Sequence, residues 1–173
     1  MTRVALGAAV DPERSIVSDG EFDPKGRYLG LEHIEKETGS ILGYGSTAEL
    51  KSAKFRFTAK HILYGKLRPY LNKVAFPDHD GVCSTDIVPL LPKPGVDRRF
   101  IGYILRAPAF AETASARATG ANLPRISPEN LLRISVPLPE PRDQSRIAAI
   151  LAEADAARRK RADNQSCCST TTH

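Results

Sequence analysis

The stretch "ILYGKLRPYLNKVAF", residues 62–76, sets Lys66, Arg68 and Lys73 among closely spaced apolar and aromatic side chains. A Gly and a Pro interrupt it, so we predict two short strands joined by an irregular cationic connection. Cations in such a setting either lie on a solvated sheet face, with their stems packed against it, or face an acidic partner. The stretch therefore predicts both a part of a sheet and a candidate binding surface.

The charge of the neighbouring segments is unevenly distributed. The 173 residues carry a net charge of +5. Residues 1–50 contain nine acids and five bases, whereas residues 51–77 contain seven bases and no acid. A local cationic surplus of this kind favours a polyanionic partner, although it says nothing about the fold.

The middle of the chain is predicted to be β-rich. Apolar and charged residues alternate in residues 53–59, which is the period of a strand with one buried face. Further strands are predicted at residues 27–34, 61–67, 72–77 and 82–91, and a strand or a short helix at residues 4–10. After Pro94 the pattern becomes helical, and two short helices are predicted to meet at Ala107–Pro108 and to end at Gly120.

The C-terminal part begins with a helix start and continues into a long helix. Ser127 and Pro128 have the pattern of an N-cap followed by the first helical residue, and a strand is expected at residues 133–138. From Pro141 onward the composition favours one long helix, in which Asp155 and Arg159 are spaced to form an i,i+4 ion pair. One side of it carries an apolar stripe that needs another helix to cover it, formed by Ile147, Ile150, Leu151, Ala154 and Ala157.

These patterns together predict an α+β protein. Residues 1–138 form a β-rich domain with short helices, residues 139–163 an amphipathic helix, and residues 164–173 a disordered tail. No apolar run reaches the roughly 18 residues that a membrane span needs, and the N-terminus lacks a signal-peptide pattern, so a cytoplasmic protein is expected. The three cysteines form neither a disulfide framework nor a paired metal-ligand spacing.

The sequence offers little support for catalysis. His79 precedes Cys83 by four residues and could act as its base, but a small Cys packed in a strand explains the same pattern. A metal site at the nearby acids is disfavoured, because neighbouring side chains of one loop seldom converge; the candidates are Asp78, His79, Asp80 and Asp86. There is no phosphate-binding loop, dinucleotide fingerprint or adenine-methyltransferase motif, so we predict no catalytic residue, no metal and no cofactor.

Two cationic segments are the candidate DNA-binding residues. Cations offset phosphate repulsion, and the planar group of an Arg can read a guanine edge with two hydrogen bonds. The alternative is that these side chains lie on a solvated sheet face without a ligand. A second segment, "ARATGANLPRIS" (residues 116–127), favours the DNA interpretation because a loop of short polar residues can reach phosphates or bases. The predicted DNA-binding set is Lys66, Arg68, Lys73, Arg117, Thr119, Asn122 and Arg125.

Four blocks, in this order, resemble a known family. They are "YLGLEHIEKETGSIL" (28–42), "GKLRPYLNK" with "CSTD" (65–86), "ATGANLPRIS" (118–127) and "ISVPLPEPRDQSRIAAIL" (134–151). Together they are similar to the target-recognition domain and spacer helix of specificity (S) subunits of type I restriction-modification systems, over residues 28–161. The resemblance implies a non-catalytic subunit that reads double-stranded DNA and directs a methyltransferase (M) subunit and a restriction (R) subunit. Because these blocks are shared by S subunits with different targets, base choice is expected in loops, among residues 35–54 and 92–100.

The chain departs from the family pattern because it has one recognition domain and one helix, whereas a full S subunit has two of each. It resembles a half-subunit or a truncated form. We therefore expect two copies to pair through Ile147, Ile150, Leu151 and Ala154 and to read a palindromic split site. The alternative is a regulatory or antirestriction fragment that occupies the methyltransferase subunit through its helix and competes with an intact S subunit.

Overall fold

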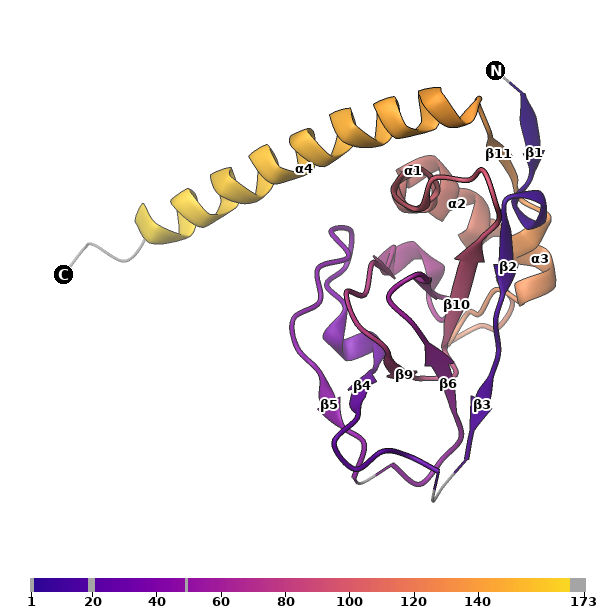
Figure 1. Cartoon of the computed structure of the whole chain (residues 1–173), viewed down its shortest axis with the longest axis vertical. Coiled ribbons are helices and arrows are strands. Elements are labelled where there is room, and N and C mark those ends of the chain that lie inside the picture. Colours follow the sequence, from indigo (N-terminus) through magenta and orange to yellow (C-terminus); the bar gives the residue numbers. More distant parts are fainter. Residues whose placement is uncertain (1, 19–20, 49, 169–173) are drawn as a thin grey trace.

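The computed structural model of the chain describes residues 2–18, 21–48 and 50–168, with side chains in the last helix up to Arg161. Figure 1 shows a β-rich body from which one long helix, α4 (Pro141–Cys168), extends. The body combines three sheets and three short helices within the described residues, so the α+β class predicted from the sequence is confirmed.

One four-stranded antiparallel sheet supports the main core. Its strand order is β2 (Val10–Pro12), β10 (Ile87–Pro92), β7 (Ile62–Gly65) and β8 (Val74–Ala75). All four residues of β7 are buried, and residues such as Ile62 and Leu90 pack against the helices of the body. Burial of both faces explains why this part of the sequence reads as a continuous apolar run.

A five-stranded mixed sheet lies at the other end of the body. Its order is β3 (Ile16–Val17), β6 (Lys54–Phe57), β9 (Gly81–Cys83), β4 (Arg27–Leu29) and β5 (Gly45–Ser46). The β4–β9 pair is parallel and the others are antiparallel. A second cluster of buried side chains, including Phe57 and Leu29, packs beneath it.

Two further strands join the beginning of the described chain to the root of α4. Strand β1 (Arg3–Ala5) pairs antiparallel with β11 (Ser135–Pro137), which directly precedes α4. Residues 4–10, predicted as a strand or a short helix, contain parts of both, because β1 is followed by the 3₁₀ helix η1 (Leu6–Ala8).

The three short helices begin as the sequence predicts. Helices α1 (Arg98–Arg106) and α2 (Pro108–Ala116) meet at Ala107. The Ser127 hydroxyl caps α3 (Pro128–Leu132) by accepting a hydrogen bond from the backbone N–H of Asn130 at 3.1 Å. Helix α2 ends at Ala116, four positions before the predicted end, because Gly120 lies farther along the loop, where it adopts a φ of 109°.

One predicted strand proved to be two. Residues 82–91 contain the end of β9 and most of β10, which belong to different sheets. The Ser84 hydroxyl accepts a hydrogen bond from the backbone N–H of Asp86 at 3.2 Å, and the backbone N–H of Ile87 donates to the Ser84 carbonyl at 2.9 Å. This turn separates the strands, and a run of apolar residues on both sides of it hid the break.

Helix α4 differs from the prediction in its end and in its buried face. It continues to Cys168, beyond the predicted end at Asp163, so part of the predicted disordered tail is helical and the rest lies outside the described residues. The side chains that α4 buries are Gln144 and Ala148, whereas Ile150 is 58% exposed. Asp155 pairs with Arg106 of α1 and not with Arg159, the predicted partner.

No helix in the described ranges combines the length and the apolar character that crossing a bilayer requires.

Candidate nucleic-acid interface

The connection after β7 presents two of the predicted DNA-binding residues. Lys66 and Arg68 follow the end of this buried strand, and the 3₁₀ helix η3 (Pro69–Leu71) begins directly after them. Arg68 has a left-handed backbone, with φ 50° and ψ 66°, and its side chain is exposed. A non-glycine residue seldom adopts this conformation without support from its surroundings.

That support comes from the second cationic segment. The backbone N–H of Arg68 donates to the Pro124 carbonyl at 2.7 Å, and the backbone N–H of Ile126 donates to the Lys66 carbonyl at 3.1 Å. The loop itself is closed by two backbone hydrogen bonds of 2.9 Å between Thr119 and Arg125. Residues 66–68 and 117–125 therefore form one unit, which we name the cationic loop pair.

Six of the seven predicted DNA-binding residues belong to this unit. All except Lys66, which is half-buried, expose their side chains: Arg68, Arg117, Thr119, Asn122 and Arg125. The unit also exposes Leu123, at 46%, near the tip of the loop. The sequence could predict the residue types, but only the fold brings together two segments that lie about 50 positions apart along the chain.

One carboxylate, that of Asp86, contacts the cationic loop pair. The Arg125 guanidinium donates to Asp86 Oδ1 at 3.0 Å, and this hydrogen bond and the charge of Asp86 raise the pKa of Arg125. The backbone N–H of Lys66 also donates to the Asp86 carbonyl at 2.9 Å. Asp86 therefore orders the unit, and Arg125 is less available to an anion than Arg68 or Arg117.

Lys73 is placed differently from the other six residues. Its side chain is half-buried, and its ammonium donates to the backbone carbonyl of Leu31 at 2.6 Å. The Lys73 carbonyl accepts a hydrogen bond from the Gly65 N–H, so the residue joins η2 (Leu31–His33) to the β7–β8 pair. This geometry favours a role in holding the fold.

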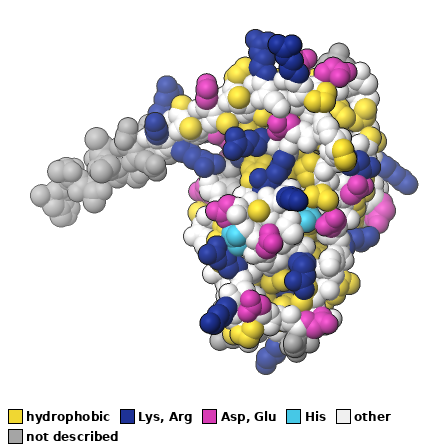
Figure 2. All heavy atoms as spheres, viewed as in Figure 1, with side chains coloured by type: hydrophobic (Ala, Val, Ile, Leu, Met, Phe, Trp, Pro, Cys, Tyr) yellow, Lys and Arg dark blue, Asp and Glu magenta, His cyan; other side chains and the backbone are white. Residues whose placement is uncertain are grey.

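The cations of residues 51–77 differ in their exposure. Lys54 is buried, with 7% exposed, and its ammonium donates to the Ser52 carbonyl at 2.9 Å and lies 5.6 Å from the centre of the Tyr28 ring. On the face shown in Figure 2, Lys and Arg side chains alternate with Asp and Glu over the body. Lys54 therefore does not contribute to an exposed basic surface.

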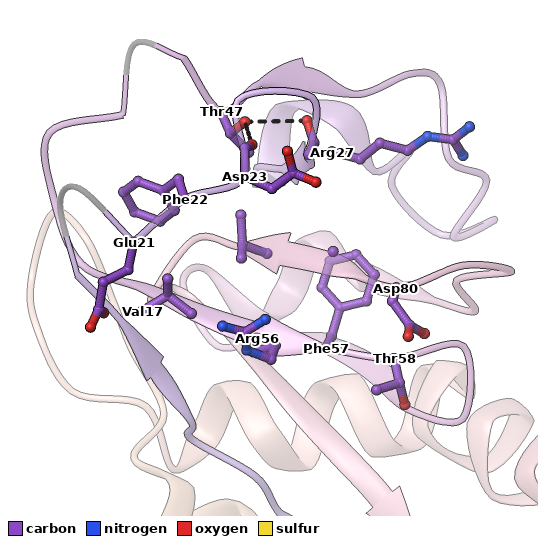
Figure 3. Close-up of a pocket in the computed structure, with 13 residues that line it drawn as sticks. Val17, Glu21, Phe22, Asp23, Arg27, Thr47, Arg56, Phe57, Thr58 and Asp80 are labelled. Carbon is purple, nitrogen blue, oxygen red and sulfur yellow. Dashed lines mark hydrogen bonds between the residues drawn. The ribbon is translucent and has the colours of Figure 1, made fainter.

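A hollow on the five-stranded sheet was missed by the sequence analysis. It has a volume of about 220 Å³ and lies between β6, β9 and the segment around Asp23. Figure 3 shows Arg56 pointing into it, opposite Asp23 and Thr47. Arg56 is exposed between the buried Phe55 and Phe57, so the strand alternation was the signal that could have identified it.

The two loop ranges in which base choice was expected fall in different surroundings. Thr47, from the first range, lines the hollow opposite Arg56, but it is buried and its hydroxyl donates to the Asp23 carbonyl. In the second range the Lys93 ammonium donates to the Gly7 carbonyl at 2.7 Å, and the Asp97 carboxylate caps α1. Lys93 and Asp97 are therefore engaged within the fold, whereas Pro94, Gly95 and Arg99 of the same range are exposed.

The thiol considered as a nucleophile is inaccessible. Cys83 is fully buried, and burial raises the pKa of its thiol to about 12, so it remains protonated at neutral pH. His79 is engaged elsewhere, with Nδ1 2.6 Å from Asp78 Oδ1 and its ring 4.5 Å from the Tyr44 ring. In the described part of the chain no group of three or more His, Cys, Asp or Glu is placed to hold a metal ion.

Comparisons with known proteins agree with the fold. The chain is 36% identical over 126 residues to the type I restriction enzyme EcoDI specificity subunit of Escherichia coli, a match that covers 72% of this chain and 28% of that subunit. It superposes on the HsdS subunit from Thermoanaerobacter tengcongensis with a TM-score of 0.74 at 22% identity, and on the S subunit from M. genitalium with 0.62 at 18%.

The chain corresponds to only part of these proteins. The superpositions cover 95% and 90% of this chain but 45% and 39% of the two solved subunits, so the chain spans less than half of their length. The model of the type I restriction modification DNA specificity domain matches residues 16–165, which includes both the cationic loop pair and most of α4. This chain therefore belongs to the type I restriction modification DNA specificity domain family.

Proposed function

We propose that this protein is a sequence-specific double-stranded DNA-binding specificity subunit of a type I restriction-modification system. It has no catalytic activity of its own and directs partner methyltransferase and restriction subunits to a target site in the cytoplasm. Family membership supports the assignment to a type I restriction-modification system. The cationic loop pair supports the proposed contact with DNA. The observation that carries the proposal is that the two segments predicted to meet DNA are joined by backbone hydrogen bonds into one exposed unit.

Within this unit we assign phosphate contacts to Lys66, Arg68 and Arg117. Their charges have no carboxylate partner among the described residues, so binding a phosphate would not require breaking an ion pair. Thr119 and Asn122 supply short polar groups at the exposed edge of the loop, suited to phosphate or sugar oxygens.

We assign base reading to the hollow of the five-stranded sheet. Arg56 makes no ion pair in the described ranges, although Glu21, Asp23 and Asp80 line the same hollow. Its planar guanidinium can donate two hydrogen bonds to a guanine edge. Replacing Arg56 by Ala should then relax specificity at one base pair, whereas replacing Arg68 should weaken binding to all sequences alike.

Selection from a randomised duplex library tests the DNA assignment. The wild-type chain, purified and incubated with the library at physiological salt, should enrich a short motif, and the Arg56→Ala variant should lose one position of it. Failure of the wild-type chain to enrich any motif, alone or with its methyltransferase subunit, would exclude the proposed function.

We further propose that two copies pair through α4. The residues predicted for this contact lie largely outside the buried face of the helix, because Ile150 and Ala154 are exposed and Ile147 and Leu151 are half-buried. Two-fold pairing would cover these side chains and place two recognition domains on a palindromic split site. Light scattering during gel filtration should give twice the chain mass for the wild type and the single chain mass for Ile150→Asp; a monomeric wild type at high concentration would exclude pairing.

The exposed stripe also supports the alternative function, a regulatory or antirestriction fragment. A free helix face could occupy the methyltransferase subunit in place of an intact S subunit. This fragment would not need DNA affinity at physiological salt. Competition with the intact S subunit by a chain that enriches no duplex would favour this alternative.

A further inference from the structure

Helix α4 meets the body at two separate polar contacts along one of its faces. The first is at Gln144 and the second at Asp155, so they are eleven residues, or about 16 Å, apart. Both contacts are made with α1 and the residues that precede it. Two points define a direction, and the pair of contacts therefore fixes the angle at which α4 leaves the body.

The first contact is buried and fully hydrogen-bonded. Gln144 is 1% exposed; its Oε1 accepts from the backbone N–H of Asp97 at 2.8 Å, and its Nε2 donates to the Pro139 carbonyl at 2.8 Å. The Asp97 carboxylate caps α1 through the N–H groups of Arg99 and Phe100 and also accepts from the Ser145 hydroxyl at 3.0 Å. The start of α1 and the start of α4 are thus held by the same few groups.

The second contact is an ion pair between Arg106, at the last residue of α1, and Asp155 of α4. Their side chains are 9% and 16% exposed, and the Arg106 guanidinium also lies 5.2 Å from the centre of the Tyr103 ring. Removing one partner of an ion pair with this little solvent contact strongly destabilises the folded state, because the remaining charge is buried without a partner.

Between these points α4 meets the body through one fully buried small side chain, whereas Leu151 and Ala152 are only half-buried. Ala148, which lies on the same face one turn after Gln144, is 2% exposed. Its methyl group permits close approach but gives little resistance to sliding or rotation. The apolar contact of α4 with the body is therefore narrow, and the polar contacts at its two ends are needed to fix the direction of the helix.

We propose that Asp97, Gln144, Ser145, Arg106 and Asp155, which we name the helix clamp, determine the spacing between the two half-sites that a pair of chains recognises. This inference rests on the proposed function, in which α4 separates two recognition domains. Figure 1 shows α4 extending past the body.

The distance from the body to the proposed pairing residues makes the direction of α4 important. The proposed pairing residues end at Ala154, which lies 13 residues, or about 20 Å, after the start of α4 at Pro141. A change of about 10° in the direction of α4 moves this point by about 3.4 Å, which is about one base-pair step. In a symmetric pair the displacement occurs twice, so a loose clamp permits several spacings where a rigid clamp permits one.

Two measurements test the clamp, both on the full chain. Spin labels at Lys60→Cys on the body and Lys160→Cys on α4, in a Cys167→Ser, Cys168→Ser background diluted with unlabelled protein, report the distance within one chain. Selection from a library of paired half-sites with graded gaps, built on the motif enriched by the wild-type chain, reports the spacing preference.

The variants are Gln144→Ala and Asp155→Ala, with Glu153→Ala as the matched control. Glu153 is an exposed acid on the same helix and makes no ion pair within the described residues. We expect both clamp variants to lose the single narrow distance peak and to accept several gaps while selecting the same bases. The control should keep one peak and one gap, and the exchange Arg106→Asp with Asp155→Arg should restore both.

The outcomes separate the two proposals. An unchanged narrow peak in both clamp variants overturns the clamp, whatever the DNA result. A broadened peak with an unchanged gap preference overturns its role in spacing. If the wild-type chain enriches no duplex, the proposed function fails and with it the assigned role in spacing, and the distance measurement alone then decides whether the clamp sets the helix angle.

Discussion

Replacing Arg68 by Gly separates DNA contact from fold stability. Arg68 adopts φ 50° and ψ 66°, a conformation that disfavours a residue with a Cβ by about 1–2 kcal/mol. Glycine relieves this strain, although its greater freedom in the unfolded chain offsets about 0.5–1 kcal/mol of the gain. We therefore expect the free energy of unfolding to stay the same or rise by up to about 1.5 kcal/mol while the guanidinium is lost.

The expected effect on binding follows from counterion release. Each phosphate contact adds about 0.9 to the slope of log K against log salt for B-DNA. Losing one contact should lower the slope by about 0.9, so that between about 50 and 200 mM salt the wild type loses about 3.5-fold more affinity than the variant. The reduction should be the same on specific and unrelated duplexes, because a phosphate carries no sequence information.

Fluorescence anisotropy titrations at several salt concentrations measure this slope, and urea unfolding followed by circular dichroism measures stability. Lys60→Ala is the matched control, since Lys60 is also exposed but precedes β7, at the opposite end of that strand from Lys66 and Arg68. If Arg68→Gly keeps the wild-type slope and affinity, the cationic loop pair does not contact phosphates through this residue. If it unfolds the domain, the conformational argument is wrong as well.

Three further predictions concern the body of the protein. Lys73→Ala should lower the free energy of unfolding in urea by about 1.5–3 kcal/mol, because it removes a charged hydrogen bond to Leu31, and should leave the salt slope unchanged; a lower slope would return Lys73 to the DNA contacts. Gly102→Ala should destabilise the fold by about 1–3 kcal/mol in the same assay, since its Cβ would lie 2.2 Å from Phe76 Cζ, and a stability equal to wild type would refute the tight packing of α1. For pH, burial raises the pKa of Cys83 from 9.0 to about 12, so the unfolded chain loses the thiol proton first and stability should fall as pH rises above 9; Cys83→Ala should lose less stability over that interval in urea titrations, and equal losses would show that the thiol is not buried.

The sequence predicted the elements of the body well where the local pattern had one interpretation. Ser127 and Pro128 identified the start of α3, and the alternation in residues 53–59 identified β6. It failed where the break was a hydrogen-bonded turn inside an apolar run, as at Ser84 between β9 and β10. It also extended α2 to Gly120, because a glycine marks many helix ends but here serves the loop.

The sequence by itself determined the residue types of the candidate interface: cations beside a buried strand, and a second loop with arginines and short polar residues. Only the tertiary structure decided how these charges are used. Backbone hydrogen bonds join residues 66–68 to residues 117–125. The Lys73 ammonium donates to the Leu31 carbonyl, and Asp155 pairs with Arg106 and not with Arg159. The physical reason is that a charged side chain binds the partner that the fold brings nearest, and the distance between two groups in space is set by long-range backbone pairing that no local pattern encodes.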